Sequence, residues 1–186
     1  MYDHGARSVC LLPEPSEFRP HHLGTEMSPD YLSDEFMLLI RSVVAQCDRL
    51  GMNYWLYDEG GWPSGGACGR VYRQDPERFG RRFIQAQMHH LEPDQPFTVP
   101  DSAVCAALED DLSKVFYPGQ TIVAGTTSLT LRLCSVERDP VAIEKYAPLV
   151  DALSREATDA FIELTHQKYH KFIGDSFGKS IRFVFT

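Results

Sequence analysis

The residues best suited to chemistry lie in one loop, residues 58–69, which follows a compact β-type run at 53–57. The loop begins with two adjacent carboxylates, Asp58 and Glu59, and continues through several glycines and Trp62. Adjacent side chains at a strand end point to opposite sides, so one carboxylate can face a ligand while the other anchors the loop. The glycines let backbone approach a ligand closely. Because Trp62 offers a flat face for a sugar ring, the pattern suits glycoside hydrolysis, in which two acids share proton transfer and water activation.

The same loop also fits a simpler structure, a tight turn into which Trp62 packs, and the pattern by itself leaves both interpretations open. It is not a phosphate-binding loop, because it contains neither G-x-x-x-x-G-K-[ST] nor G-x-G-x-x-G. Adjacent Asp110 and Asp111 are most simply a turn.

Other polar candidates lie outside this loop. Glu14 and His21 follow the first predicted strand, where we expect contact with substrate. His166 and His170 have the spacing of a zinc pair, but Gln167 stands where H-E-x-x-H has its glutamate. We interpret these two as surface histidines, His166 at the edge of the apolar stripe of its helix and His170 opposite that stripe.

The elements that must position the loop form a predicted βαβ unit. Residues 7–12 read as a short apolar strand. From Ser33, a good N-cap, apolar residues recur at steps of three and four as far as Gly51, which indicates an amphipathic helix. The run at 53–57 is the second strand, parallel to the first. In parallel α/β folds, functional loops leave the carboxyl ends of strands, and the carboxylate loop has that position.

The α/β alternation is interrupted further along the chain. Residues 84–88 alternate in polarity, which favours a half-solvated strand, with a helix as the alternative. Residues 92–138 hold β-rich runs between turn signals, and we predict an antiparallel β insertion there. A helix at 154–174 and a strand at 180–185 then resume the alternation. Because the chain stops at a strand–loop junction, at Thr186, we expect a fragment of a longer protein.

Composition limits the classes of function. The 186 residues are 43% hydrophobic and 24% charged, as in a soluble globular domain. The net charge of −8 disfavours a nucleic-acid partner, and no apolar run is long enough for a membrane span. Five scattered cysteines form neither a disulfide framework nor a C-x-x-C zinc pair. The compartment stays open: bacterial-type cytoplasmic, or secreted or periplasmic.

The motif Tyr57-Asp-Glu-Gly-Gly-Trp-Pro-Ser-Gly65, together with Tyr31-Leu-Ser-Asp-Glu-Phe36 and Leu50-Gly-Met-Asn-Tyr-Trp-Leu56, resembles the large bacterial α-L-rhamnosidase-type glycoside hydrolases. Phe161-Ile-Glu-Leu-Thr-His166 and Phe177-Gly-Lys179 resemble the segment before an Asp-Glu-Pro in that family. The resemblance covers most of residues 7–90 and 139–186. It implies a carbohydrate substrate, namely α-L-rhamnosides or related plant and pectic glycans, with inversion of configuration and calcium at the site.

On these grounds we predict an α/β fold: a partial (β/α)8 barrel of the TIM type, with residues 1–186 as an incomplete glycoside hydrolase barrel and 92–138 as a β-rich insertion. The rest of the same polypeptide is expected to complete the barrel. Glu59 is the predicted catalytic carboxylate, and Asp58, Trp62, Glu14 and His21 are the predicted substrate-binding residues.

The resemblance places the second carboxylate after Thr186 and leaves the metal ligands unassigned, since Gly60 stands where many relatives have an acidic residue. Two alternatives stay open: a glycosidase for other sugars, such as a galactosidase, and a non-catalytic or degenerate carbohydrate-binding protein.

Overall fold

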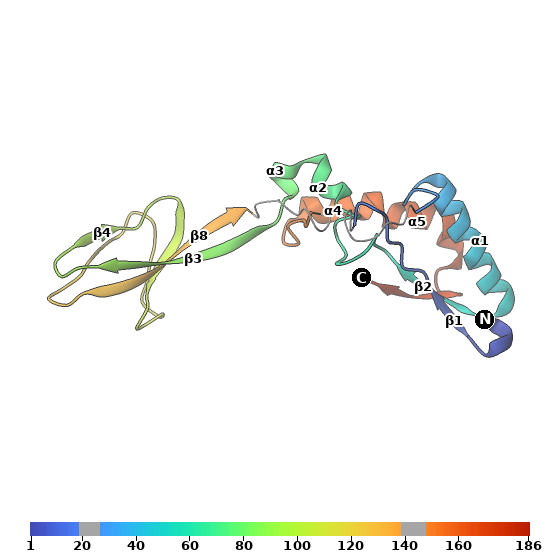
Figure 1. Cartoon of the computed structure of the whole chain (residues 1–186), viewed down its shortest axis with the longest axis horizontal. Coiled ribbons are helices and arrows are strands. Elements are labelled where there is room, and N and C mark those ends of the chain that lie inside the picture. The colour runs from blue at the N-terminus through green and yellow to red at the C-terminus, as the bar shows by residue number, and fades with distance from the viewer. Residues whose placement is uncertain (19–26, 139–147) are drawn as a thin grey trace. The chain divides into compact units, whose positions relative to one another are not determined.

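The computed structural model of the chain describes residues 1–18, 27–138 and 148–186 (Figure 1). The chain divides into two compact units. The first unit contains Met1–Arg81 and Pro140–Thr186, and the second contains Arg82–Asp139.

The first unit is built on a parallel sheet of three strands in the order β1-β2-β9. These strands are β1 (Ser8–Cys10), β2 (Asn53–Tyr57) and β9 (Ile181–Phe185). Helix α1 (Asp34–Leu50) connects β1 to β2, so the predicted parallel βαβ unit is present, although β1 is shorter than the expected strand at 7–12. A short 3₁₀ helix, η1 (Tyr2–His4), precedes the sheet.

Helix α1 has the ends that its sequence predicts. The Ser33 hydroxyl accepts a hydrogen bond from the backbone N–H of Phe36 at 3.1 Å, which satisfies one of the free donors of the first turn. Gly51 ends the helix in the left-handed region, with φ of 63°. The buried residues of the helix form one stripe: Phe36, Met37, Ile40, Val44 and Cys47.

Short helices follow β2, and a broken helix precedes β9. The first are α2 (Arg70–Gln74) and α3 (Pro76–Phe79). The helix predicted at 154–174 is divided into α4 (Arg155–Leu164) and α5 (His166–Ile173), which meet at the buried Thr165, and the 3₁₀ helix η2 (Gly174–Ser176) follows them. The Thr165 hydroxyl donates to the carbonyl of Phe161 at 2.7 Å.

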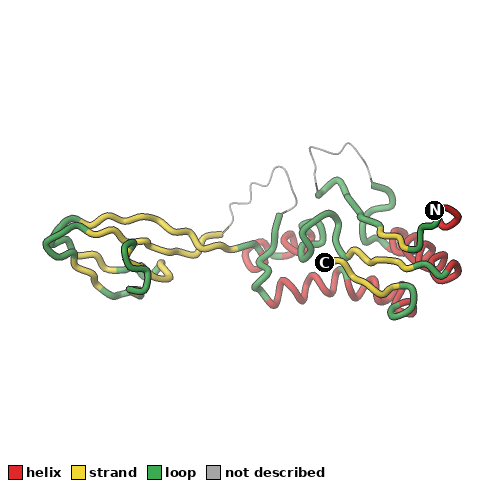
Figure 2. The backbone as a smooth tube through the Cα atoms, turned by 90° about the horizontal axis from the view of Figure 1, so that it is seen from below, coloured by secondary structure: helices red, strands yellow, loops and turns green. Residues whose placement is uncertain are grey.

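The two faces of the parallel sheet differ. Tyr54, Leu56 and Ile181 are buried in one core with residues of α1 and α5, and Figure 2 shows helices along one side of the strands. On the other face, Trp55 lies 4.7 Å from Phe183 between ring centroids, and these side chains are 39% and 47% exposed. Only one face of the sheet therefore contributes to the described core.

The second unit consists of antiparallel strands. Its four-stranded sheet has the order β3-β8-β5-β6, made of β3 (Arg82–Leu91), β8 (Leu129–Arg138), β5 (Ala103–Leu108) and β6 (Val115–Phe116). A separate pair joins β4 (Pro96–Thr98) to β7 (Thr121–Val123). The small core of this unit is formed by Leu91, Val99, Ala103, Ala106, Ile122, Ala124 and Leu131.

The prediction of a partial (β/α)8 barrel is wrong. Such a barrel needs parallel strands that alternate regularly with helices. In the described residues, only three strands are parallel, and the other six pair antiparallel in two further sheets. The fold is mixed α/β. No helix within the described ranges combines the length and the apolar character that crossing a membrane requires.

Candidate functional site

The loop after β2 is fixed by bonds to its surroundings. The Gly61 N–H donates to the carbonyl of Pro13 at 2.8 Å, which joins this loop to the segment after β1. The Tyr57 hydroxyl donates to the carbonyl of Gly61. Gly61 has φ of 97°, and a Cβ at this position would overlap the ring of Phe18. Glycine is therefore required here both by backbone conformation and by packing.

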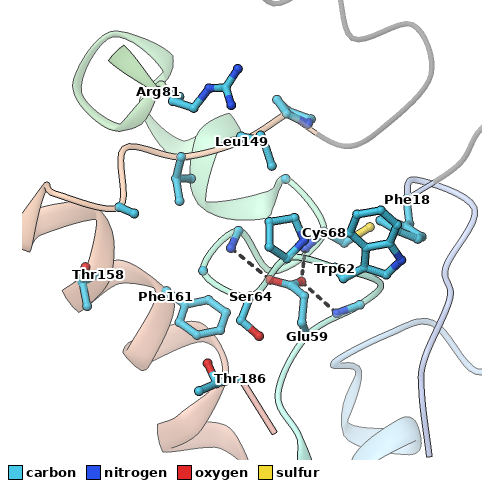
Figure 3. Close-up of a pocket in the computed structure, with 18 of the residues that line it drawn as sticks. Phe18, Glu59, Trp62, Ser64, Cys68, Arg81, Leu149, Thr158, Phe161 and Thr186 are labelled. Carbon is cyan, nitrogen blue, oxygen red and sulfur yellow. Dashed lines mark hydrogen bonds between the residues drawn. The ribbon is translucent and has the colours of Figure 1, made fainter. Parts of the chain in front are cut away.

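The Glu59 carboxylate lies at the centre of the loop and is only 2% exposed. It accepts four backbone hydrogen bonds, some of which Figure 3 draws as dashed lines. Its Oε1 accepts from Gly60 at 2.8 Å and Cys68 at 2.5 Å, and its Oε2 accepts from Gly66 at 3.0 Å and Ala67 at 2.8 Å. Burial raises the pKa of Glu59, and the four N–H groups oppose that shift. Glu59 thus organises the turn whose backbone surrounds it.

Asp58 is fully buried, and its two oxygens have different partners. The Ser64 hydroxyl donates to Oδ1 at 2.6 Å. The Nε2 of His166, at the start of α5, lies 2.8 Å from Oδ2. The carbonyl of Asp58 accepts from the Tyr31 hydroxyl at 3.2 Å. Asp58 therefore connects the loop after β2 to α5, which lies 108 residues further along the chain.

A cavity of about 540 Å³ opens beside this loop, within the usual range for small-molecule sites. Glu59, Trp62 and Ser64 from the loop contribute to its lining, as do His166 and Thr186. The Trp62 side chain is 57% exposed, and Figure 3 shows it beside Phe18, with ring centroids 6.1 Å apart in an edge-to-face arrangement. The cavity thus combines an exposed aromatic face with hydroxyl, imidazole and carboxylate groups.

The predicted site residues divide into three groups. Glu59 and Trp62 line the cavity together. Asp58 is not among its lining residues, and it supports His166 instead. Glu14 is partly exposed and is not among the lining residues either. His21 lies outside the described residues.

Sequence reasoning missed His166 and Ser64. The interpretation of His166 as a surface histidine is wrong in one respect: its ring is partly exposed, but one nitrogen bonds a fully buried carboxylate. Asp58 is 108 residues away, so no local pattern links the two. The one available signal was the position of His166 at the edge of the apolar stripe.

The described residues do not fit the calcium site that the resemblance implies. Calcium takes six to eight oxygen ligands. The oxygens of Asp58 and Glu59 already accept hydrogen bonds, and within residues 1–18, 27–138 and 148–186 no group of three or more His, Cys, Asp or Glu side chains could hold a metal. A Cβ on Gly60 would lie 2.9 Å from the Tyr31 ring and 3.1 Å from Pro15, so an acidic side chain there would require a local shift.

Comparisons with protein-family models, with curated proteins and with solved structures gave no match to this chain.

Proposed function

We propose that the cavity beside Trp62 binds a sugar residue, and that the chain is part of a glycoside hydrolase acting on α-L-rhamnosides or related plant and pectic glycans. The observation that carries the proposal is the exposed Trp62 ring on the wall of a cavity of about 540 Å³ that also holds polar side chains. Aromatic faces pack against the C–H surfaces of sugars, while polar groups bond their hydroxyls. The resemblance of the 57–65 motif supplies the class of sugar.

Hydrolysis requires two carboxyl groups, one to protonate the leaving oxygen and one to activate water or attack the sugar. Glu59 is the candidate for the first role, because it lines the cavity and because burial raises its pKa, as is usual for a general acid. Its four backbone hydrogen bonds constrain this role. Proton transfer from Glu59 requires that one of its oxygens leaves its backbone partners. The resemblance places the second carboxylate after Thr186, so we assign turnover to a longer protein and sugar binding to the residues described above.

A second candidate function is carbohydrate binding without catalysis. The same four hydrogen bonds favour it, because a carboxylate whose oxygens are all engaged serves the structure of the loop. In that case, the cavity retains its affinity for the sugar, and Glu59 takes no part in chemistry.

Replacing Trp62 tests the proposal, and the chain contains a matched control. Of the two tryptophans, only Trp62 lines the cavity, whereas Trp55 lies partly exposed on the sheet face. We expect Trp62→Ala to weaken the binding of methyl α-L-rhamnoside by about two- to tenfold, since an aromatic contact contributes about 0.5–1.5 kcal/mol beyond area burial. Trp55→Ala should leave the affinity unchanged. NMR titration of the 186-residue chain measures both, with methyl galactoside as the competing sugar.

Equal affinity of the wild type and Trp62→Ala would contradict sugar binding in this cavity. An equal loss of affinity in Trp62→Ala and Trp55→Ala would contradict it as well. Preference for the galactoside would support the glycosidase for other sugars. In the longer protein, hydrolysis of p-nitrophenyl α-L-rhamnoside separates the enzyme from the non-catalytic binding protein.

A further inference from the structure

Asp58 and His166 form a hydrogen-bonded pair in which His166 lines the cavity and Asp58 lies behind it, and the proposed hydrolysis does not use this pair. Asp58 is fully buried, and its Oδ2 lies 2.8 Å from Nε2 of His166. The His166 side chain is 41% exposed and lines the cavity that Trp62 also lines. A buried carboxylate thus bonds Nε2 of a ring that is partly exposed.

If Asp58 is ionised, its hydrogen bonds indicate which nitrogen of His166 carries the proton. An ionised carboxylate only accepts hydrogen bonds, so both of its partners must donate. Ser64 donates its hydroxyl proton to Oδ1, and His166 must therefore donate Nε2–H to Oδ2. In a neutral imidazole with the proton on Nε2, the other nitrogen, Nδ1, is an acceptor. Among the described residues, Nδ1 of His166 has no hydrogen-bond partner.

We propose that Asp58 fixes His166 in the tautomer with the proton on Nε2, and that Nδ1 of His166 accepts a hydrogen bond from a sugar hydroxyl in the cavity beside Trp62. This inference rests on the proposed function, and it adds a residue that determines specificity. His166 is the group that touches the ligand, while Asp58 and Ser64 position it. A site built to accept a hydrogen bond from a hydroxyl discriminates against a sugar that lacks that hydroxyl, because the acceptor is left unpaired.

The substitution His166→Gln distinguishes the roles of the two ring nitrogens. The glutamine amide can still donate to Oδ2 of Asp58, so the buried carboxylate keeps a partner, but no acceptor remains at the position of Nδ1. The matched control is His170→Gln, which changes the exposed histidine one turn further along α5; His170 does not line the cavity beside Trp62. We expect His166→Gln to weaken the binding of L-rhamnose by about two- to tenfold, the scale of one neutral hydrogen bond, and His170→Gln to leave it unchanged.

Long-range proton–nitrogen NMR of the wild-type chain gives a second measurement that does not depend on a variant. At a pH where the seven histidines are neutral, His166 should show the proton on Nε2, and added L-rhamnose should shift its Nδ1 resonance. If the proton is on Nδ1, the inference is overturned. If L-rhamnose binds while Nδ1 does not shift and His166→Gln keeps full affinity, the inference fails and the proposed function stands. If L-rhamnose does not bind the wild type, the proposed function fails, and the hydroxyl contact fails with it.

Discussion

Replacing Glu59 by glutamine measures how far the loop after β2 depends on this carboxylate. The substitution keeps the size of the side chain and one of its oxygens, and it turns the other oxygen into an NH₂ group. In the folded chain, each oxygen of Glu59 accepts two backbone hydrogen bonds. The glutamine amide therefore leaves two buried backbone N–H groups facing a donor.

The expected loss of stability follows from those two groups. Each buried donor left without a partner costs about 1–3 kcal/mol, so the two together cost about 2–6 kcal/mol. Part of this cost is offset, because burying the charged carboxylate of Glu59 is unfavourable and the neutral glutamine amide avoids that penalty. We expect a net decrease of about 3 kcal/mol in the free energy of unfolding of the first unit. Because natural domains have only about 5–15 kcal/mol in total, this is a large effect.

Tryptophan fluorescence in urea is the suitable assay. Both tryptophans of the chain, Trp55 and Trp62, belong to the first unit, so the signal reports that unit and not the antiparallel sheets. The control is Glu163→Gln, which makes the same chemical change at an exposed position of α4. A decrease below about 1 kcal/mol for Glu59→Gln, or an equal decrease in the control, would refute the argument that Glu59 organises the loop.

Two further predictions concern the same loop. Gly61→Ala should destabilise the first unit by more than about 3 kcal/mol, because it adds overlap with Phe18 to the strain of a positive φ, whereas Gly5→Ala, with φ of 89° and open space around its Cβ, should cost only about 1–2 kcal/mol in the same fluorescence assay. Burial raises the pKa of Glu59 above its unfolded value, so the extra stability that comes with protonation of this group is present below the unfolded pKa and is lost as the pH rises through the folded pKa. The difference in unfolding free energy between wild type and Glu59→Gln should therefore decrease as the pH rises, and an increase would contradict the direction of the shift.

Local patterns were sufficient to predict the βαβ unit. The N-cap at Ser33, the left-handed glycine at 51 and the apolar stripe between them are interactions within one helix, so they are visible in a short window of sequence. The strand at 53–57 is predicted with the bounds of β2. The pairing of β1 with β2 follows because a helix connects them, and such a crossover gives parallel strands.

The fold class could not be obtained in the same way, because it depends on which strands pair. The barrel prediction rests on one βαβ unit and on the resemblance to α-L-rhamnosidase-type glycoside hydrolases. The segment from Arg82 to Arg138, which includes the antiparallel insertion predicted at 92–138, closes on itself, with β3 paired to β8 along ten residues in each strand. Pairing partners this far apart in sequence are set by tertiary contacts that composition and periodicity do not record. The same limit applies to the bond between Asp58 and His166.

The two adjacent carboxylates of the loop show what alternation along a strand can and cannot predict. Neighbouring side chains at the end of β2 were expected to point to opposite sides, one toward a ligand and one into the loop. In the structure, Glu59 bonds the backbone of its own loop and also lines the cavity, while the fully buried Asp58 bonds His166. Neither carboxylate is free of protein partners. In the part of the chain that the structure describes, Nδ1 of His166 has no hydrogen-bond partner, so we expect a ligand hydroxyl to bond the imidazole, with Asp58 positioning the ring.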